Sequence, residues 1–162
     1  MIDPHLAAIG WHADHQVAWG EKPREGELPA RVAGLHRNHI VDLMTVDGEL
    51  AGRPACRMLQ DRSPTSAMPA VGDWVSTLPD GTIQEILPRR SALARRNAAD
   101  RDRIQILATN IDKAIVISSL NREHDPVRLE RMVRLAEASG AEPVIGLSKA
   151  DLSDESDELK ER

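Results

Sequence analysis

IDKAIVISSLNREHDPVRLERMVRLAEASGAEPVIGLSKADL, residues 111–152, is the stretch that decides the fold of the C-terminal part of the chain. Its run Ala114–Leu120 is apolar and β-branched, which is typical of a strand buried on both faces of a parallel sheet. Asp125 suits a helix N-cap, and Pro126 suits the first helical position because its missing N–H is not needed there. Apolar side chains then recur with helical spacing at Leu129, Met132, Val133 and Ala136. With a second apolar strand at Pro143–Leu147, the stretch predicts a right-handed βαβ unit with any ligand at the carboxyl end of a strand.

A short polar motif, Ser148-Lys149-Ala150-Asp151, follows that second strand. A carboxylate at the position of Asp151 can accept both the N1–H and the exocyclic amine of guanine, and adenine offers no such pair of donors. The alternative is a solvated turn between a strand and a helix. Because the motif follows a βαβ unit, we interpret Ser148, Lys149 and Asp151 as guanine-binding residues, with Ser148 where GTPases carry Asn or Thr.

The preceding segment, residues 29–97, has the pattern of a small all-β domain. Asp47-Gly48 and Pro79-Asp80-Gly81 are hairpin turn signals between short apolar runs. Five strands of this length suit a closed OB-type barrel, which leaves no exposed sheet edge. The expected strands are Ala30–His36, Ile40–Val46, Pro54–Leu59, Val71–Leu78 and Thr82–Leu87. Cys56, the single cysteine, is expected to be a small buried residue in the third strand and excludes a disulfide framework.

Charge is distributed unevenly along the chain. The net charge is −5, but residues 29–103 carry eleven arginines against nine acidic residues. Arginine binds phosphate better than lysine does, so the arginines after the barrel are candidate RNA contacts, with a solvated linker as the alternative. These candidates are Arg89, Arg90, Arg95 and Arg96. Trp74 is a further candidate, either exposed to stack on a base or packed in the barrel.

Several motifs occur together in one order: Gly10-Trp11, PAVGDWV at 69–75, GTIQEILPRRSALARRNA at 81–98, QILATNID at 105–112 and the βαβ segment with SKAD. In this combination the chain resembles the RsgA (YjeQ) family of ribosome-small-subunit-dependent, circularly permuted GTPases. The resemblance implies an all-β OB-type barrel followed by a partial α/β (βαβ) permuted GTPase domain. The domains expected are an N-terminal extension at 1–28, the barrel at 29–97, a linker at 98–103 and an incomplete GTPase domain at 104–162.

The resemblance also implies partners and cofactors. Family members act in the assembly of the small ribosomal subunit, so rRNA, guanine nucleotide, magnesium and a zinc site are expected of the full protein. The sequence given has neither G-x-x-x-x-G-K-[ST] nor D-x-x-G, and it lacks a Cys/His cluster, so it is expected to be an N-terminal portion that does not hydrolyse GTP alone. His12 and His15 have no accompanying third ligand, so no metal site is predicted in this chain.

Three functions stay open at this point. The chain is the N-terminal part of a ribosome-assembly GTPase, a stand-alone OB-type RNA-binding module with a vestigial α/β extension, or a structural interaction domain. We favour the first. The sequence has no apolar stretch long enough to cross a bilayer and no signal-peptide pattern, so a cytoplasmic protein without membrane partners is expected. The oligomeric state does not follow from the sequence.

Overall fold

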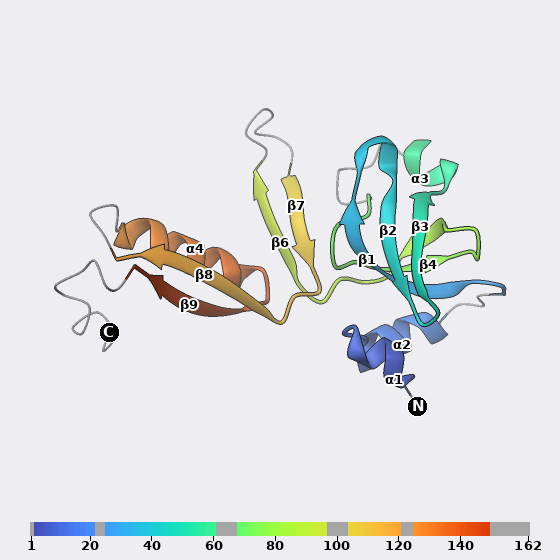
Figure 1. Ribbon diagram of the computed structural model, residues 1–162, viewed down its shortest axis with the longest axis horizontal. Helices are drawn as coiled ribbons and strands as arrows, with labels where there is room; N and C mark the ends of the chain where they lie inside the picture. The colour runs from blue at the N-terminus through green and yellow to red at the C-terminus, as the bar shows by residue number, and fades with distance from the viewer. Residues whose placement is uncertain (1, 22–24, 61–67, 97–103, 121–124, 150–162) are drawn as a thin grey trace. The chain divides into compact units, whose positions relative to one another are not determined.

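The computed structural model describes residues 2–21, 25–60, 68–96, 104–120 and 125–149 (Figure 1). The chain divides into two compact units, Met1–Asn110 and Ile111–Arg162, which we describe separately. No helix within the described ranges has the length and apolar character needed to span a membrane.

The first unit contains a closed five-stranded barrel, which confirms the OB-type expectation. The strands are paired in the order β1-β2-β3-β5-β4, and β1 closes the barrel by pairing antiparallel with β4. Aliphatic side chains fill its interior, namely Ala30, Val32, Val41, Leu43, Val75 and Ile83. The strands are β1 (Leu28–Leu35), β2 (Val41–Thr45), β3 (Gly48–Pro54), β4 (Trp74–Thr77) and β5 (Thr82–Ile86).

The third barrel strand differs from the prediction. We expected it at Pro54–Leu59, but β3 starts at Gly48, directly after the Asp-Gly turn, and ends at Pro54. Pairing with β2 from Thr45↔Gly48 to Val41↔Gly52 uses Gly48 of the predicted turn and the residues after it, for which we had predicted no strand. The expected strand is instead the short helix α3 (Cys56–Gln60), and Cys56 is exposed rather than buried.

Two short helices precede the barrel, α1 (Pro4–Ala8) and α2 (Ala13–Gly20). The Asp3 side chain caps α1 by accepting a hydrogen bond from the His5 N–H at 2.8 Å. Their apolar side chains form a second core with the barrel, separate from its interior. Its buried members are Leu6, Trp11, Trp74 and Leu87.

A hairpin that we did not predict follows the barrel. Strand β6 (Ala92–Arg96) pairs antiparallel with β7 (Ile104–Thr109), from Ala92↔Thr109 to Arg96↔Ile104. Strand β7 therefore belongs to the first compact unit, which ends at Asn110. The predicted linker 98–103 lies outside the described residues, so the proposed domain boundaries stay a prediction.

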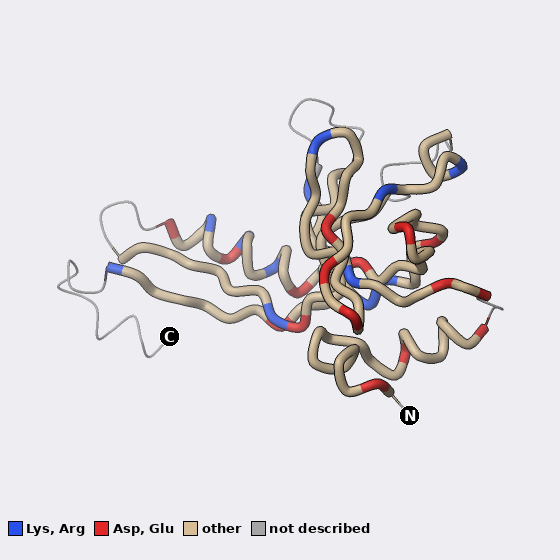
Figure 2. The backbone as a smooth tube through the Cα atoms, turned by 45° about the vertical axis from the view of Figure 1, so that its right-hand side comes forward, with Lys and Arg blue, Asp and Glu red and all other residues tan. Residues whose placement is uncertain are grey.

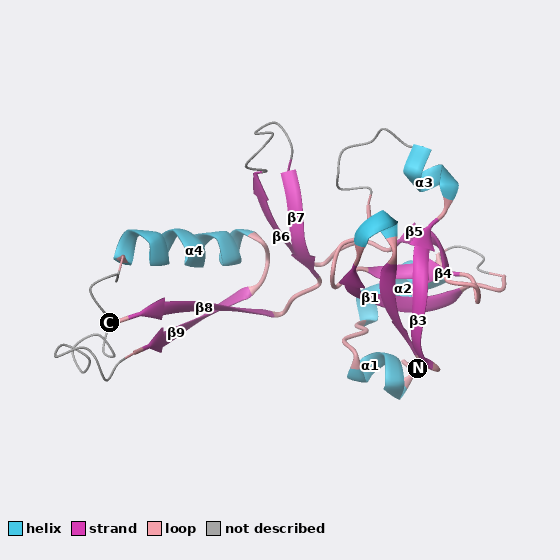
Figure 3. Cartoon of the chain, turned by 45° about the horizontal axis from the view of Figure 1, so that its top comes forward, coloured by secondary structure: helices cyan, strands magenta, loops and turns pink. Residues whose placement is uncertain are grey.

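The second unit is the predicted βαβ unit, with parallel strands β8 (Lys113–Ser119) and β9 (Glu142–Ser148) joined by α4 (Pro126–Ala138). The Asp125 side chain caps α4 by accepting from the Arg128 N–H at 3.0 Å. Helix α4 lies along one face of the two strands (Figure 3). Basic and acidic residues mix along α4 (Figure 2), and Arg134 pairs with Glu130 one turn away.

The burial of this unit differs from the expected strand buried on both faces. Along β8, Ile115 and Ile117 are 70% and 72% exposed, and they alternate with less exposed neighbours. The paired strand β9 leaves Val144 exposed opposite Ile115. Within the described residues, α4 covers one face of the strand pair and the apolar residues of the other face are open to solvent.

Candidate functional site

The guanine motif begins at the carboxyl edge of the βαβ unit. Ser148 is the last residue of β9 and pairs with Ser119, the last residue of β8. The Leu120 N–H donates to the Ser148 carbonyl at 2.8 Å, so pairing continues one residue past the strand. Because ligands of parallel α/β sheets bind beyond the carboxyl ends of the strands, this edge is where a nucleotide base is expected.

The backbone turns sharply at Lys149. Its φ is 58°, a left-handed conformation that residues with a Cβ rarely adopt, and its side chain is exposed. The preceding Ser148 is half-buried, and its Oγ donates a long hydrogen bond of 3.4 Å to the Ser118 carbonyl. Ser148, the first residue of the motif, is therefore bound to the sheet, whereas the next residue, Lys149, is exposed. Asp151, the predicted reader of the base, lies outside the described residues, and its role stays a prediction.

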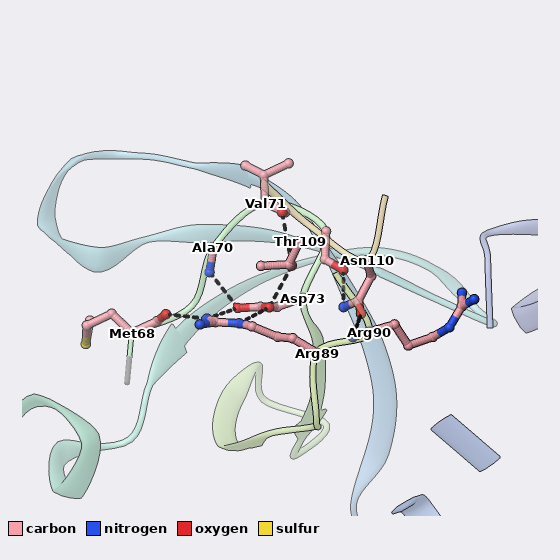
Figure 4. Close-up of polar contacts among 9 residues, drawn as sticks. Met68, Ala70, Val71, Asp73, Arg89, Arg90, Thr109 and Asn110 are labelled. Atoms are coloured by element: carbon pink, nitrogen blue, oxygen red, sulfur yellow. Dashed lines mark hydrogen bonds and ion pairs between the residues drawn. The ribbon is translucent and has the colours of Figure 1, made fainter. Parts of the chain in front are cut away.

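Arg89, a candidate RNA contact, is bound inside the first unit instead (Figure 4). Its Nε and Nη2 atoms donate to the two carboxylate oxygens of Asp73 at 2.7 and 2.6 Å. Nη2 also donates to the Met68 carbonyl at 3.1 Å. Asp73 is fully buried and accepts a further bond from the Ala70 N–H at 2.8 Å. A bidentate pair of this kind is a structural contact, so Arg89 is not available to RNA in this arrangement.

The same carboxylate binds the end of β7, a contact that the sequence did not indicate. The Thr109 hydroxyl donates to Asp73 at 2.7 Å, and the Asn110 side-chain amide donates to the Gly72 carbonyl at 3.0 Å (Figure 4). Gly72 has φ +92°, and a Cβ there would lie 2.1 Å from the Thr109 carbonyl oxygen. Only glycine permits this approach. An acidic residue in the otherwise apolar PAVGDWV segment was the one signal that a buried partner existed.

The other three arginines have different surroundings. The Arg90 side chain is 34% exposed and lies 3.5 Å from the Asp14 carboxylate, while its backbone N–H donates to Asn110 Oδ1 at 2.9 Å. Arg95 on β6 is exposed and donates to Gln105 Oε1 at 3.3 Å. The side chain of Arg96 lies outside the described residues. Arg89, Arg90 and Arg95 therefore have three different partners rather than one shared basic surface.

Trp74 is buried, which excludes the predicted stacking role in this arrangement. Its side chain is fully covered and contacts the Trp11 ring edge-on, with centroids 4.7 Å apart and planes at 87°. The alternative of plain packing is confirmed, although the partners are the N-terminal helices rather than the barrel interior. The alternation of side chains along β4 could not reveal that helices cover this face.

Comparisons with known proteins agree with this architecture. The sequence profile of the RsgA GTPase family matches residues 86–162. The chain is 37% identical over 160 residues to the small ribosomal subunit biogenesis GTPase RsgA of Opitutus terrae, covering 91% of this chain and 43% of that protein. It is 38% identical over 150 residues to the protein of the same name from Streptomyces coelicolor, covering 91% and 40%. The chain belongs to the RsgA family. It spans about two fifths of the length of these RsgA relatives.

Two solved structures of the RsgA type share the fold. YjeQ from Thermotoga maritima matches 84% of this chain and 46% of its own, with a TM-score of 0.61 at 24% identity. YloQ, described as a circularly permuted GTPase, matches 85% and 47%, with a TM-score of 0.59 at 18% identity. At these identities the similarity establishes the fold alone.

The RsgA resemblance implies magnesium and a zinc site for the full protein. Among the described residues there is no group of three His, Cys, Asp or Glu side chains that could hold a metal ion. A zinc site of His, Cys or carboxylate ligands is therefore not found in these ranges. At the carboxyl edge of the βαβ unit, the half-buried Ser148 and the exposed Lys149 are both polar.

Proposed function

We propose that this chain is the N-terminal part of a GTPase that acts in the assembly of the small ribosomal subunit in the cytoplasm. The barrel binds rRNA, and Ser148, Lys149 and Asp151 recognise guanine. The observation that carries the proposal is the position of Ser148 and Lys149 at the carboxyl edge of a parallel βαβ unit, in a chain whose relatives are named small ribosomal subunit biogenesis GTPases.

Guanine recognition is supported by the local geometry. The Ser148 hydroxyl donates to a carbonyl of β8 where β9 ends, and the next residue, Lys149, has a left-handed backbone conformation. The aliphatic part of an exposed lysine can cover the face of a base. The Asp151 carboxylate then accepts the two guanine N–H groups, and the loss of both bonds discriminates against adenine. When bound, the nucleotide supplies the phosphate whose transfer is the reaction.

RNA binding is supported by fewer basic residues than the sequence suggested. Arg89 is paired with the buried Asp73, which leaves Arg90, Arg95 and Arg96 as the candidates from the arginine segment. The barrel's β1–β2 connection adds Arg37 and His39, and OB folds commonly bind nucleic acid through such loops. Contacts of this kind are to phosphates and give affinity without sequence preference.

The stand-alone RNA-binding module stays a second candidate, because the barrel is closed without the second unit. The two functions separate in one experiment, in which the chain and a version ending at Asn110 are sedimented with purified small or large ribosomal subunits. Ending at Asn110 retains the bonds of Thr109 and Asn110 to the barrel, which a cut at residue 103 would remove.

For the assembly GTPase we expect both versions to bind small subunits in preference to large ones. Equal binding to free RNA and to both subunits favours the general RNA-binding module. If neither version binds ribosomal subunits or free ribosomal RNA, both functions are contradicted.

A further inference from the structure

A buried histidine lies at the centre of the contact between the N-terminal helices and the barrel. His15 on α2 is 1% exposed. Its ring lies 5.4 Å from that of Trp11 and 5.7 Å from that of Trp74, measured between centroids. Trp19 contacts Trp11 edge-on at 6.1 Å, so all three tryptophans of the chain are in this cluster. The sequence has no other aromatic residue of the Phe or Tyr type.

One ring nitrogen of His15 must be unprotonated in this arrangement. The His12 backbone N–H donates to Nδ1 of His15 at 3.1 Å, at the start of α2. Nδ1 can accept that bond only in a neutral ring whose proton is on Nε2, because both nitrogens of a protonated imidazole are donors. Protonation would therefore break a bond that closes the first turn of the helix and would leave two donors facing each other.

Of the groups that shift the pKa of His15, only the Asn110 side chain favours the protonated ring. Nε2 of His15 is buried and makes no hydrogen bond of normal geometry with the described residues. Asn110 is nearby, but its Oδ1 already accepts from the Arg90 N–H and its amide donates to the Gly72 carbonyl. A second proton on the ring would thus place a positive charge in a largely apolar site, where the Asn110 side chain offsets only part of the cost.

The charged groups around the ring also oppose protonation. Burial is the largest cause that lowers the pKa of His15, the Asn110 side chain opposes this in part, and the positive groups of His12, Arg90 and Arg31 lower it further. Asp14, the acidic neighbour on α2, is 3.5 Å from Arg90 and mostly exposed. The direction of the shift agrees with the geometry.

We propose that residues 2–21 form an acid-sensitive clasp over one end of the barrel, which is closed while His15 is neutral and opens when the ring is protonated. Opening also breaks the bond from Arg31 Nη1 to the Ile9 carbonyl and uncovers Trp74. The sign follows from linkage. A histidine whose pKa is lower in the closed state binds its proton more tightly in the open state, so protonation favours opening. The clasp is therefore stable above the ordinary histidine pKa and is lost as the pH falls through the closed-state value.

The tryptophans give a direct measurement, since no other fluorophore of the chain competes with them. Emission and acrylamide quenching of the 162-residue chain should be followed from about pH 8 to about pH 5, with amide exchange measured by NMR. We expect a red shift and stronger quenching on acidification, and faster exchange of α2 amides while those of β1, β2 and β3 stay protected. The opening constant should rise about tenfold for each unit by which the closed-state pKa is lowered.

Two variants test the role of the ring. In His15→Gln the acid response should disappear, because a neutral side chain remains at that position. His5→Gln is the matched control, because His5 is an exposed residue of α1, and its acid response should equal that of the unchanged chain. The proposal is overturned if the chain shows no acid response, if His15→Gln retains it, or if the barrel amides lose protection together with α2. Should His15→Gln not fold, the NMR titration of His15 in the unchanged chain decides. A titration midpoint equal to that of the opening supports the clasp, and a different midpoint rejects it.

Discussion

The fully buried carboxylate of Asp73 and the guanidinium of Arg89 form a bidentate ion pair, with Nε to Oδ1 at 2.7 Å and Nη2 to Oδ2 at 2.6 Å. Through the Thr109 hydroxyl, the same carboxylate also holds the end of β7. The pair therefore connects the loop before β4, the segment after β5 and the hairpin. It uses a residue that the sequence suggested for RNA binding.

Removing the guanidinium should destabilise the first unit strongly. Arg89→Ala leaves Asp73 as an uncompensated buried charge, which costs about 3–5 kcal/mol. Arg95→Ala is the matched control, since Arg95 is exposed and its loss should change the free energy of unfolding by about 0.5 kcal/mol or less. Urea unfolding followed by tryptophan fluorescence measures both. Equal stability of the two variants would show that the Asp73–Arg89 pair is not structural.

The contribution of the hairpin arginines to RNA binding is measurable through salt. Each phosphate contact contributes a slope of roughly −0.7 to −0.9 to the plot of log affinity against log salt. Replacing Arg95 and Arg96 with alanine should therefore make the slope less negative by about 1.5 and weaken different RNAs equally. Lys113→Ala is the control. Lys113 is an exposed residue of β8 that pairs with Glu142, and its replacement should leave the slope unchanged. An unaltered slope in the double variant would show that these two arginines do not contact RNA phosphates.

The sequence predicted the barrel and the βαβ unit because both depend on local signals. Asp-Gly and Pro-Asp-Gly separate the barrel strands, and Asp125-Pro126 marks the start of α4. Strand β6 was missed because ALARR has no strand-like alternation, and its conformation follows from pairing with β7. The partner of Arg89 could not be predicted, since Asp73 is 16 residues away in sequence and the pair forms only when the barrel closes.

At the candidate site, the position of Ser148 was predictable because a polar motif after an apolar strand must lie at the carboxyl edge of a parallel sheet. The burial of Trp74 could not be predicted in the same way. Alternation along a strand assigns residues to two faces, but it does not show which face the distant helices α1 and α2 cover.

The chain alone should not hydrolyse GTP. Phosphoryl transfer requires a backbone cradle, a lysine and magnesium around the phosphates, and the sequence given has no phosphate-binding loop motif. Lys149 belongs to the base-recognition motif and cannot replace those groups. Phosphate release by the purified 162-residue chain is the measurement, with heat-denatured chain as the blank. Turnover above ~10⁻² s⁻¹ would contradict this expectation.

Guanine recognition by Asp151 is the central claim, and nucleotide selectivity tests it most directly. In a full-length protein built on this chain, Asp151→Asn should weaken GTP binding more than tenfold, because a charge-assisted bond pair worth on the order of 2–4 kcal/mol is lost. Part of the affinity should move to xanthine nucleotides, whose carbonyl at the 2-position accepts from the new amide. Asp125→Asn, at the cap of α4, is the control that keeps its capping bond and should leave GTP affinity unchanged. We expect a reversal of preference between GTP and XTP in Asp151→Asn alone, and an unchanged GTP affinity in that variant would contradict the role of Asp151 as the reader of the base.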